Sequence, residues 1–411
     1  MRLIVIGAGL SGLVAASEVQ GAGHDVVVLE ARDRVGGRVL TIRDGLRDGQ
    51  YADVGAEMIY HGQERILALC AAHDLDLTTE FSLGTDTPGL ILHGRRLTDD
   101  ASREIAQELR DAVGRVPPGH FETVAQWLRR ARLSHDAELL LGAIAQGTPA
   151  APLRLADSQE LNVELSWGKG YRKIRGGNDL LPRALARGVD VRLGQTARLV
   201  QHGDGGVRVE TDRDTFDGDR VLVTVPGPLV SELGFDPVLP ADKVRALLQL
   251  RYGNGTRLIV QYADRDAVRA AIGLGCFTDR MPGYIMEQTM QQPGDHVVIS
   301  GLAAGDAEPA LMTADQTLDQ FDRVLGTVAG RPLTRTFGHV KNWTADPLTR
   351  AVVRAPLGDQ RETVLPLVRQ PIRDRVFFAG EHTDDRVGPG GMEGAIRSAY
   401  RVVGEILGRP T

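Results

Sequence analysis

Cysteine is scarce in this chain of 411 residues, which contains only Cys70 and Cys276. The two lie far apart and show no paired spacing, so we expect neither a disulfide framework nor a zinc cluster. No arrangement of histidines and acidic residues elsewhere has the spacing of a metal site. This use of cysteine favours a cytoplasmic protein without a bound metal.

Long apolar runs are missing as well. No stretch reaches about 18 apolar residues, which argues against a membrane span, and MRLIVIGAG enters a strand without the regions of a signal peptide. The net charge of −6 and the lack of a sustained basic run give no support for a nucleic-acid or membrane partner. We expect a globular protein of two domains, because 411 residues exceed one ordinary domain. The oligomeric state stays open.

What the sequence does contain is a glycine motif at its start. In RLIVIGAGLSG an apolar run stops at Gly7, Gly9 and Gly12, and a helical pattern follows. The glycines permit a tight turn and close approach to a pyrophosphate, and the helix N-terminus offers free N–H groups. The next apolar run, DVVVLE, ends at Glu30, whose carboxylate suits a ribose hydroxyl. A chance glycine turn is the alternative, but this order of elements favours a dinucleotide site.

The segment after Glu30 favours a flavin over a nicotinamide. In ARDRVGGRVLT, Gly36 and Gly37 let a loop press against a ligand, and Arg38 is suited to neutralise a diphosphate. An ordinary basic surface loop is the alternative interpretation. The small residues of YADVGAEMI then offer backbone against which a flat ring can lie.

Six motifs in order carry a resemblance to a known family. GAGLSG, EARDRVGGR, DVGAEMI, GGNDLLPRALA, VLVTVPG and FFAGEHT…GGMEGAIRSA together resemble the flavin-dependent amine oxidases, from Met1 to about Tyr400, with a looser match over 85–165. The resemblance implies FAD, and a last strand, loop and helix that close over the flavin. It implies non-covalent FAD, because no cysteine lies in the segment after Trp343 where some members attach it. The residues that we predict to bind FAD are Gly7, Gly9, Ser11, Gly12, Glu30, Ala31, Arg32, Gly36, Gly37, Arg38, Gly55, Ala56, Glu57, Met58, Ala197, Gly380, Glu381, Gly391, Met392 and Ala395.

The same resemblance implies an α/β fold of two discontinuous domains. We expect residues 1–80, 170–248 and 360–411 to form a Rossmann-like FAD-binding domain with the GxGxxG motif. Residues 81–169 and 249–359 then form a substrate-binding domain with a mixed β-sheet and helices. The patterns of 180–225 and of TRLIVQYA and DHVVISGLA indicate strands, and those of 99–146 indicate helices.

The catalytic residues show departures from the family pattern. Arg257 stands where amine oxidases typically have a lysine that is linked to oxygen reactivity, and a structural ion pair is its alternative role. Trp343 matches a family tryptophan near the flavin, although a buried core tryptophan explains it nearly as well. His61 follows the segment of the flavin pocket, and a structural histidine is again the alternative. We take these three as the catalytic candidates.

The substrate side departs further. Gly391 and Val353 stand where monoamine-type members have two aromatic walls, and Tyr171 and Tyr284 are candidates to fill that space. Amino-acid oxidases commonly have an arginine where this chain has Glu57 and Met58. Arg350 or Arg354 as the carboxylate partner is the alternative, and the favoured interpretation is that both are solvated surface arginines.

The leading hypothesis is an FAD-dependent oxidoreductase that removes hydride from a C–H bond next to an amine nitrogen and forms an imine. The substrate is then a specialised or bulky small amine, and the electron acceptor is oxygen or another compound. An alternative keeps the flavin but forms a carbon–carbon double bond with an acceptor other than oxygen. A remote alternative is a binding protein without catalysis.

Overall fold

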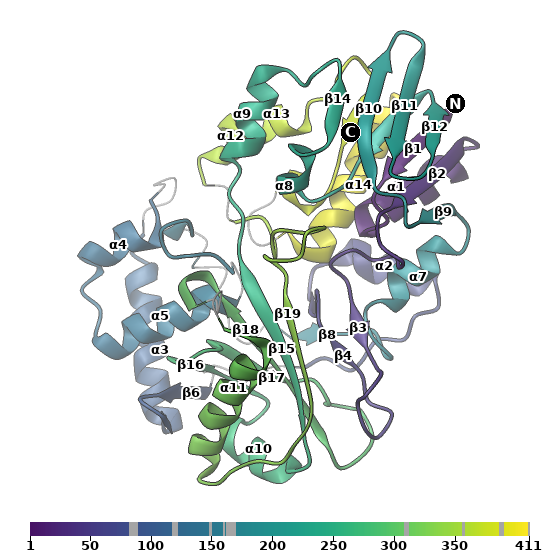
Figure 1. Ribbon diagram of the computed structural model, residues 1–411. Coiled ribbons are helices and arrows are strands. Elements are labelled where there is room, and N and C mark those ends of the chain that lie inside the picture. Colours follow the sequence, from purple (N-terminus) through teal and green to yellow (C-terminus); the bar gives the residue numbers. More distant parts are fainter. Residues whose placement is uncertain are drawn as a thin grey trace.

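The structure is a computed structural model that describes residues 1–81, 89–116, 122–147, 150–158, 161, 170–307, 312–355, 358–385 and 390–409. The beginning, middle and end of the chain meet in one half of the molecule, shown in purple, teal and yellow in Figure 1. The long strands β15 (Gly255–Tyr262) and β19 (Arg335–Asn342) run into the other half. Two large sheets therefore organise the fold.

The first sheet has five parallel strands in the order β20-β13-β1-β2-β9. The side chains of its central strand, β1, point alternately to the two faces of the sheet. Leu3 and Val5 pack on one face, and Ile4 and Ile6 pack on the other. A sheet covered on both faces produces such continuous apolar runs. The strands are β1 (Arg2–Ile6), β2 (Asp25–Glu30), β9 (Asp190–Leu193), β13 (Arg220–Val223) and β20 (Val376–Phe378).

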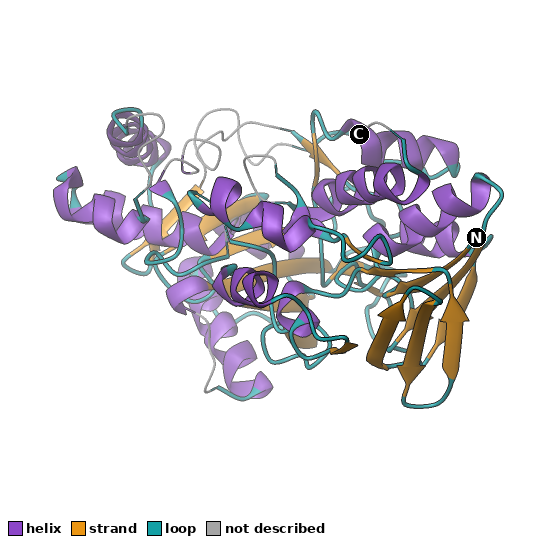
Figure 2. Cartoon of the chain, turned by 90° about the horizontal axis from the view of Figure 1, so that it is seen from above, coloured by secondary structure: helices purple, strands orange, loops and turns teal. Residues whose placement is uncertain are grey.

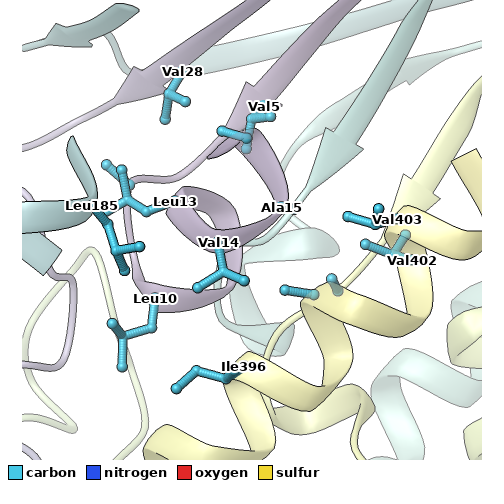
Figure 3. Packing of buried hydrophobic residues seen from close by; sticks show 14 of the residues in the cluster. Val5, Leu10, Leu13, Val14, Ala15, Val28, Leu185, Ile396, Val402 and Val403 are labelled. Atoms are coloured by element: carbon cyan, nitrogen blue, oxygen red, sulfur yellow. The ribbon is translucent and has the colours of Figure 1, made fainter. Parts of the chain in front are cut away.

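Helices α1 (Leu10–Gly21) and α14 (Gly391–Leu407) pack against each other on one face of this sheet. Figure 3 shows the shared cluster, in which Val14 of α1 and Ile396 of α14 lie near Val5 of the sheet. All three side chains are almost completely buried. The last helix of the chain is therefore part of the core around the first one. Helices α2 (Glu64–Ala72) and α7 (Leu180–Ala186) flank the pair.

A smaller sheet of four strands, in the order β12-β11-β10-β14, lies at one end of the molecule beside the N-terminus (Figure 2). Strands β10 and β11 are antiparallel and turn at Gly203–Gly206, where the sequence GDGG is typical of a hairpin turn. The other face of the five-stranded sheet packs against this smaller sheet and against helices α9 and α13. The elements are β10 (Ala197–Gly203), β11 (Gly206–Thr211), β12 (Thr215–Gly218), α8 (Gly227–Val230), β14 (Gly234–Asp236), α9 (Ala241–Gln249), α12 (Gln360–Thr363) and α13 (Leu365–Arg369).

The second large sheet is mixed and has seven strands in the order β19-β15-β18-β17-β16-β6-β7. Helices α10 and α11 pack on one of its faces, and α5 with α3 packs toward the other. The remaining elements of this half are β6 (Gly89–Leu92), β7 (Arg95–Arg96), α3 (Asp99–Val113), α4 (Val124–Ala131), α5 (His135–Gly147), α10 (Arg265–Ile272), β16 (Gly275–Thr278), β17 (Tyr284–Glu287), β18 (Val297–Ala304) and α11 (Ala314–Ala329).

Short elements join the two halves. Two small antiparallel pairs are β3 (Thr41–Ile42) with β4 (Ala52–Asp53) and β5 (Ile59–Tyr60) with β8 (Tyr171–Arg172). Short 3-10 helices lie at Gly305–Ala307 and Glu381–Thr383. In the described residues no helix is long and apolar enough to cross a bilayer.

The α/β fold class is confirmed, and so are the helices expected over 99–146 where the structure describes them. The expectation of strands over 180–225 holds from Asp190 onward but is wrong for Leu180–Ala186, which form helix α7 because Leu181 and Leu185 pack on the core as one helical face. All strands of the parallel sheet come from the segments that we assign to the FAD-binding domain, and all strands of the seven-stranded sheet come from the other segments. The domain boundaries themselves remain a prediction.

Candidate active site

A cavity of about 1110 Å³ runs between the parallel sheet and the seven-stranded sheet. Every residue predicted to bind FAD lines it, except Gly12. The three catalytic candidates and the four substrate-side candidates line it too. Segments from the start, middle and end of the chain therefore form one cavity.

The glycine turn between β1 and α1 forms one wall. A Cβ on Gly12 would lie 2.0 Å from the Gly7 carbonyl oxygen, which explains why a residue that does not line the cavity must be glycine. Gly9 has no atom within 4 Å of a Cβ position and faces the cavity. It is also the N-cap of α1 and makes no side-chain cap, so the helix presents its N-terminus openly. The Ser11 hydroxyl lies 3.2 Å from the Ser398 hydroxyl of α14.

Glu30 is held in place at the end of β2. Its carboxylate accepts hydrogen bonds from Ala8 N at 2.8 Å and from Arg32 N at 2.9 Å, one on each oxygen. Each oxygen keeps a second lone pair for a ribose hydroxyl. The Arg32 side chain does not extend freely into the cavity, because it donates to Asp346 at 2.8 Å and to Thr349 at 3.0 Å.

The loop after Glu30 is held by an arginine that the motif analysis missed. Arg34 donates to the backbone oxygens of Val35, Gly37 and Val39. Gly36 and Gly37 both have positive φ, at 99° and 57°, which side chains rarely adopt. The position of Arg34 just before the two glycines of ARDRVGGRVLT was the signal in the sequence that could have identified it.

Arg38 connects this loop with the end of the chain. Its Nη1 donates to Glu381 at 2.9 Å and to the Val352 oxygen at 3.0 Å. Burial disfavours the Glu381 carboxylate, but Arg38 and His382 outweigh it, and the pKa of Glu381 is lowered. Glu381 is therefore charged in the cavity wall.

The C-terminal segment forms the opposite wall. Gly380 has φ 130°, and a Cβ there would lie 2.7 Å from the His382 ring. The N-terminus of α14, at Gly391, has no side-chain cap, while Met392 and Ala395 face the cavity. Glu393, which the sequence analysis did not single out, accepts from the N–H groups at the start of α2. His382 is buried and does not line the cavity.

Small residues follow on the next wall. A Cβ on Gly55 would lie 1.9 Å from the Arg38 oxygen, so this close backbone approach requires glycine. The Met58 sulfur accepts from the Tyr60 hydroxyl at 2.8 Å. Glu57, the residue between Ala56 and Met58, is part of a network of ion pairs.

That network begins at Arg257, whose Nη1 donates to Glu57 Oε2 at 3.1 Å. Glu57 Oε1 accepts from Lys173 at 3.0 Å, and Lys173 lies 3.4 Å from Asp53. Burial raises the pKa of Asp53, and the two carboxylates raise the pKa of Lys173 against its burial. Lys173, which the sequence analysis also missed, is therefore a buried cation behind the cavity wall.

The far end of the cavity is an apolar surface built on one row of the seven-stranded sheet. Arg257 of β15 pairs with Leu302 of β18, Leu302 with Tyr284 of β17, and Tyr284 with Phe277 of β16. Side chains of directly paired residues lie on the same face. All four line the cavity, and Ile144 of α5 joins them. The Phe277 and Tyr284 rings are 5.1 Å apart.

The remaining candidates differ in burial. Tyr171 is buried, and its hydroxyl donates to the Met286 sulfur at 2.9 Å. Trp343 is also buried and donates from Nε1 to the Val54 oxygen at 3.1 Å. His61 is exposed at the rim, while Val353 and Gly391 leave space beside the cavity without an aromatic ring of their own.

Arg350 and Arg354 differ in their exposure to solvent. Arg350 is half-exposed and pairs with Glu232 at 2.5 Å. Reading Arg354 as a surface residue is wrong, because only 2% of it is exposed and its guanidinium donates to the Ala355 oxygen. Packing of the segment after Trp343 against Glu381 buries it.

Both cysteines are free and buried. In the described residues, no three histidines, cysteines or acidic residues lie together as a metal site.

Comparison with protein families matches residues 10–166 and 95–407 to the flavin containing amine oxidoreductases. The chain belongs to this family. It is 26% identical to a mouse L-amino-acid oxidase, over 98% of the chain and 70% of that protein. It is also 26% identical to the rice lysine-specific histone demethylase 1 homolog 1, over 98% of the chain and 52% of that protein.

Solved structures show the same fold. A putrescine oxidase variant superposes with a TM-score of 0.82 at 20% identity, over 100% of this chain and 99% of that one. Cyclohexylamine oxidase from Brevibacterium oxydans IH-35A superposes with a TM-score of 0.81 at 21% identity, over 99% of each chain.

The protein is an FAD-dependent, amine oxidase-like oxidoreductase, and its cavity residues fit the cofactor. The open space at Gly9 and the uncapped N-terminus of α1 suit a pyrophosphate. The fixed Glu30 carboxylate suits a ribose. The uncapped N-terminus of α14 suits an electron-rich ring edge.

Proposed function

We propose that this amine oxidase acts on a small amine with a single nitrogen and an apolar body. The observation that carries the proposal is the apolar row of Leu302, Tyr284 and Phe277, with Ile144 facing the same cavity. Burying apolar surface contributes a binding free energy of roughly 25 cal/mol for each Å² removed from water. It would hold the carbon body of the amine and exclude water around it.

The reaction we propose removes hydride from the C–H bond next to the nitrogen. The nitrogen lone pair forms the new C=N bond, and the nitrogen loses a proton to water, so that a neutral imine results. FAD, when bound, supplies the two-electron acceptor for this hydride. Tyr171 and Tyr284 remain protonated at neutral pH, since burial raises the pKa of both tyrosines. These two tyrosines therefore orient the substrate and do not act as bases.

The charges around the cavity support a monoamine over a diamine. Glu57, Glu232 and Glu381 are each paired with an arginine. Glu30 and Glu393 accept backbone N–H groups instead. In the part of the chain that the structure describes, every carboxylate lining the cavity therefore has a partner. A second ammonium group would meet no acid reserved for it.

We also propose that FAD is bound without a cysteine bond. Cys70 and Cys276 lie in apolar clusters away from the cavity lining. Burial raises the pKa of their thiols to about 11 and about 12, which disfavours the reactive thiolate. Denaturation should release the flavin from the polypeptide.

An anaerobic reduction experiment tests the proposed function. The flavin spectrum is recorded while cyclic, aromatic and aliphatic monoamines, amino acids and diamines are added, and air is then admitted. Bleaching by monoamines or amino acids but not by putrescine supports the proposal. Recovery in air with peroxide identifies oxygen as acceptor.

Recovery only with an artificial acceptor would instead favour a dehydrogenase, which the charged Arg257 at the usual lysine position permits. A flavin that no amine bleaches would overturn the amine reaction. It would then favour the alternative, in which a carbon–carbon double bond forms.

A further inference from the structure

The guanidinium of Arg257 has donors that the protein does not use. Glu57 takes only Nη1, and within the described chain Nε and Nη2 make no hydrogen bond. These two nitrogens are not sealed inside the protein, because neither is among the buried atoms that lack a partner. The side chain is 12% exposed, and it lines the cavity. The free edge of Arg257 therefore faces the cavity.

That edge has a defined recognition geometry. Nε–H and the adjacent Nη2–H point in parallel, and this fork matches the two oxygens of a carboxylate. A lysine at the same position would offer a point charge and no fork.

The charges behind Arg257 leave its cation available. Glu57 is shared between Arg257 and Lys173, so its one negative charge faces two cations. Lys173 also lies near Asp53, at 3.4 Å. Glu57 thus fixes the direction of the guanidinium without occupying its free edge. An anion in the cavity would therefore meet two donors that Glu57 leaves unused.

The register of the sheet sets what lies beside this fork. Leu302 is directly opposite Arg257, and Tyr284 follows on the next strand. A molecule bound by its carboxylate at Arg257 would lay its adjoining carbon chain on this apolar row. In an α-amino acid, one carbon joins the carboxylate, the amine and the side chain. A carboxylate at Arg257 would therefore fix the position of the reacting C–H bond.

We propose that the Nε and Nη2 edge of Arg257 binds the carboxylate of the substrate, and that the substrate is an amino acid with an apolar side chain. This inference rests on the proposed function, whose substrate it narrows. It gives Arg257, on strand β15, a role in specificity. Amino-acid oxidases commonly have their arginine elsewhere, in the segment where this chain has Glu57 and Met58. The competing role for the same edge is contact with the bound flavin.

Binding of an unreactive carboxylate tests the inference without turnover. We would titrate the FAD-loaded enzyme with 3-phenylpropanoate, which has no amine to oxidise, and with the uncharged 3-phenylpropanamide, by calorimetry. The carboxylate should bind at least about 10-fold more tightly than the amide. Equal affinities would overturn the inference.

Two variants of Arg257 locate the binding. Arg257→Lys keeps the ion pair with Glu57 but loses the fork, and Arg257→Met loses both. Each should weaken 3-phenylpropanoate by about 10- to 100-fold and the amide by less than about 3-fold. Arg208→Met, which removes an exposed arginine on β11, is the control for the loss of one charge and should change neither affinity. FAD content and circular dichroism show that each variant is folded.

The outcomes separate this inference from the proposed function. If amines bleach the flavin but Arg257→Lys binds the carboxylate as well as the parent does, the inference fails alone. A changed flavin reduction potential in that variant would then assign the edge to the flavin. If the carboxylate binds through Arg257 but no amine or amino acid bleaches the flavin, the proposed function and the amino-acid substrate both fail, and only the carboxylate site stands.

Discussion

Arg38 and Glu381, which are 343 positions apart, form an ion pair of 2.9 Å in the wall of the FAD cavity. The Glu381 carboxylate also accepts from the backbone N–H of Arg354. The pair joins the glycine loop after β2 to the strand and helix that end the chain. The last tenth of this sequence therefore completes a site that its first tenth begins.

Glu381→Ala should destabilise the protein by about 3 kcal/mol, because it leaves Arg38 partly buried without its counter-ion. Urea unfolding of the apoprotein measures this change. FAD affinity should fall as well. Asp217→Ala, which removes the acid of the exposed pair with Arg208, is the matched control and should leave the midpoint unchanged. Equal shifts for the two variants would contradict a special role of the buried pair.

Three glycine-to-alanine changes should separate folding from cofactor binding. Gly12→Ala should destabilise the apoprotein, because its Cβ would meet the Gly7 oxygen at 2.0 Å. In Gly9→Ala the Cβ enters the cavity without touching protein, so we expect the parent's stability and an FAD affinity at least about 10-fold weaker. Gly21→Ala, at the open end of α1, should affect neither. Thermal unfolding of apoprotein and flavin fluorescence titration measure both properties, and reduced apoprotein stability in Gly9→Ala would refute the distinction.

Lys173→Met should cost about 3–5 kcal/mol of stability at pH 7.5, because buried Asp53 would lose its cation and Glu57 would keep only Arg257 as a partner. The loss should shrink as the pH falls, because burial raises the pKa of Asp53 and this carboxyl then takes up a proton. Adding Glu57→Gln to Lys173→Met should recover part of the loss. A double-mutant cycle by urea unfolding checks this, and additive effects would exclude coupling between the two residues.

His382 should make the protein sensitive to acid. Burial lowers its pKa from 6.5 to about 4. Between these values the unfolded chain holds the proton and the native protein does not. The contribution is therefore fully present above about pH 6.5 and is lost as the pH falls toward 4, by about 3 kcal/mol in total.

His382→Gln removes this titration. The difference in unfolding free energy between the parent and the variant should change over that interval and stay constant above it. His135→Gln, at an exposed position, is the control and should leave the pH profile unchanged. A parallel pH profile for parent and His382→Gln would show that His382 does not contribute.

The sequence by itself determined the cofactor half of the site. Gly7, Gly9, Gly12 and Glu30 act through local backbone geometry, and their spacing along one strand, turn and helix is the spacing that the phosphates and ribose require. The alternation in RLIVI likewise determined which side chains of β1 face each layer. Such features need no knowledge of distant residues, and the order of the motifs was enough to predict the fold class.

Only the tertiary structure decided what the charged residues do. Arg32 turns to Asp346, 314 positions away, and Glu57 meets Arg257 and Lys173, 200 and 116 positions away. The apolar wall likewise depends on the register of three strands and on the packing of α5. A flexible charged side chain has several partners within its reach, and the partner that it meets is set by long-range packing. No local pattern in the sequence records that choice.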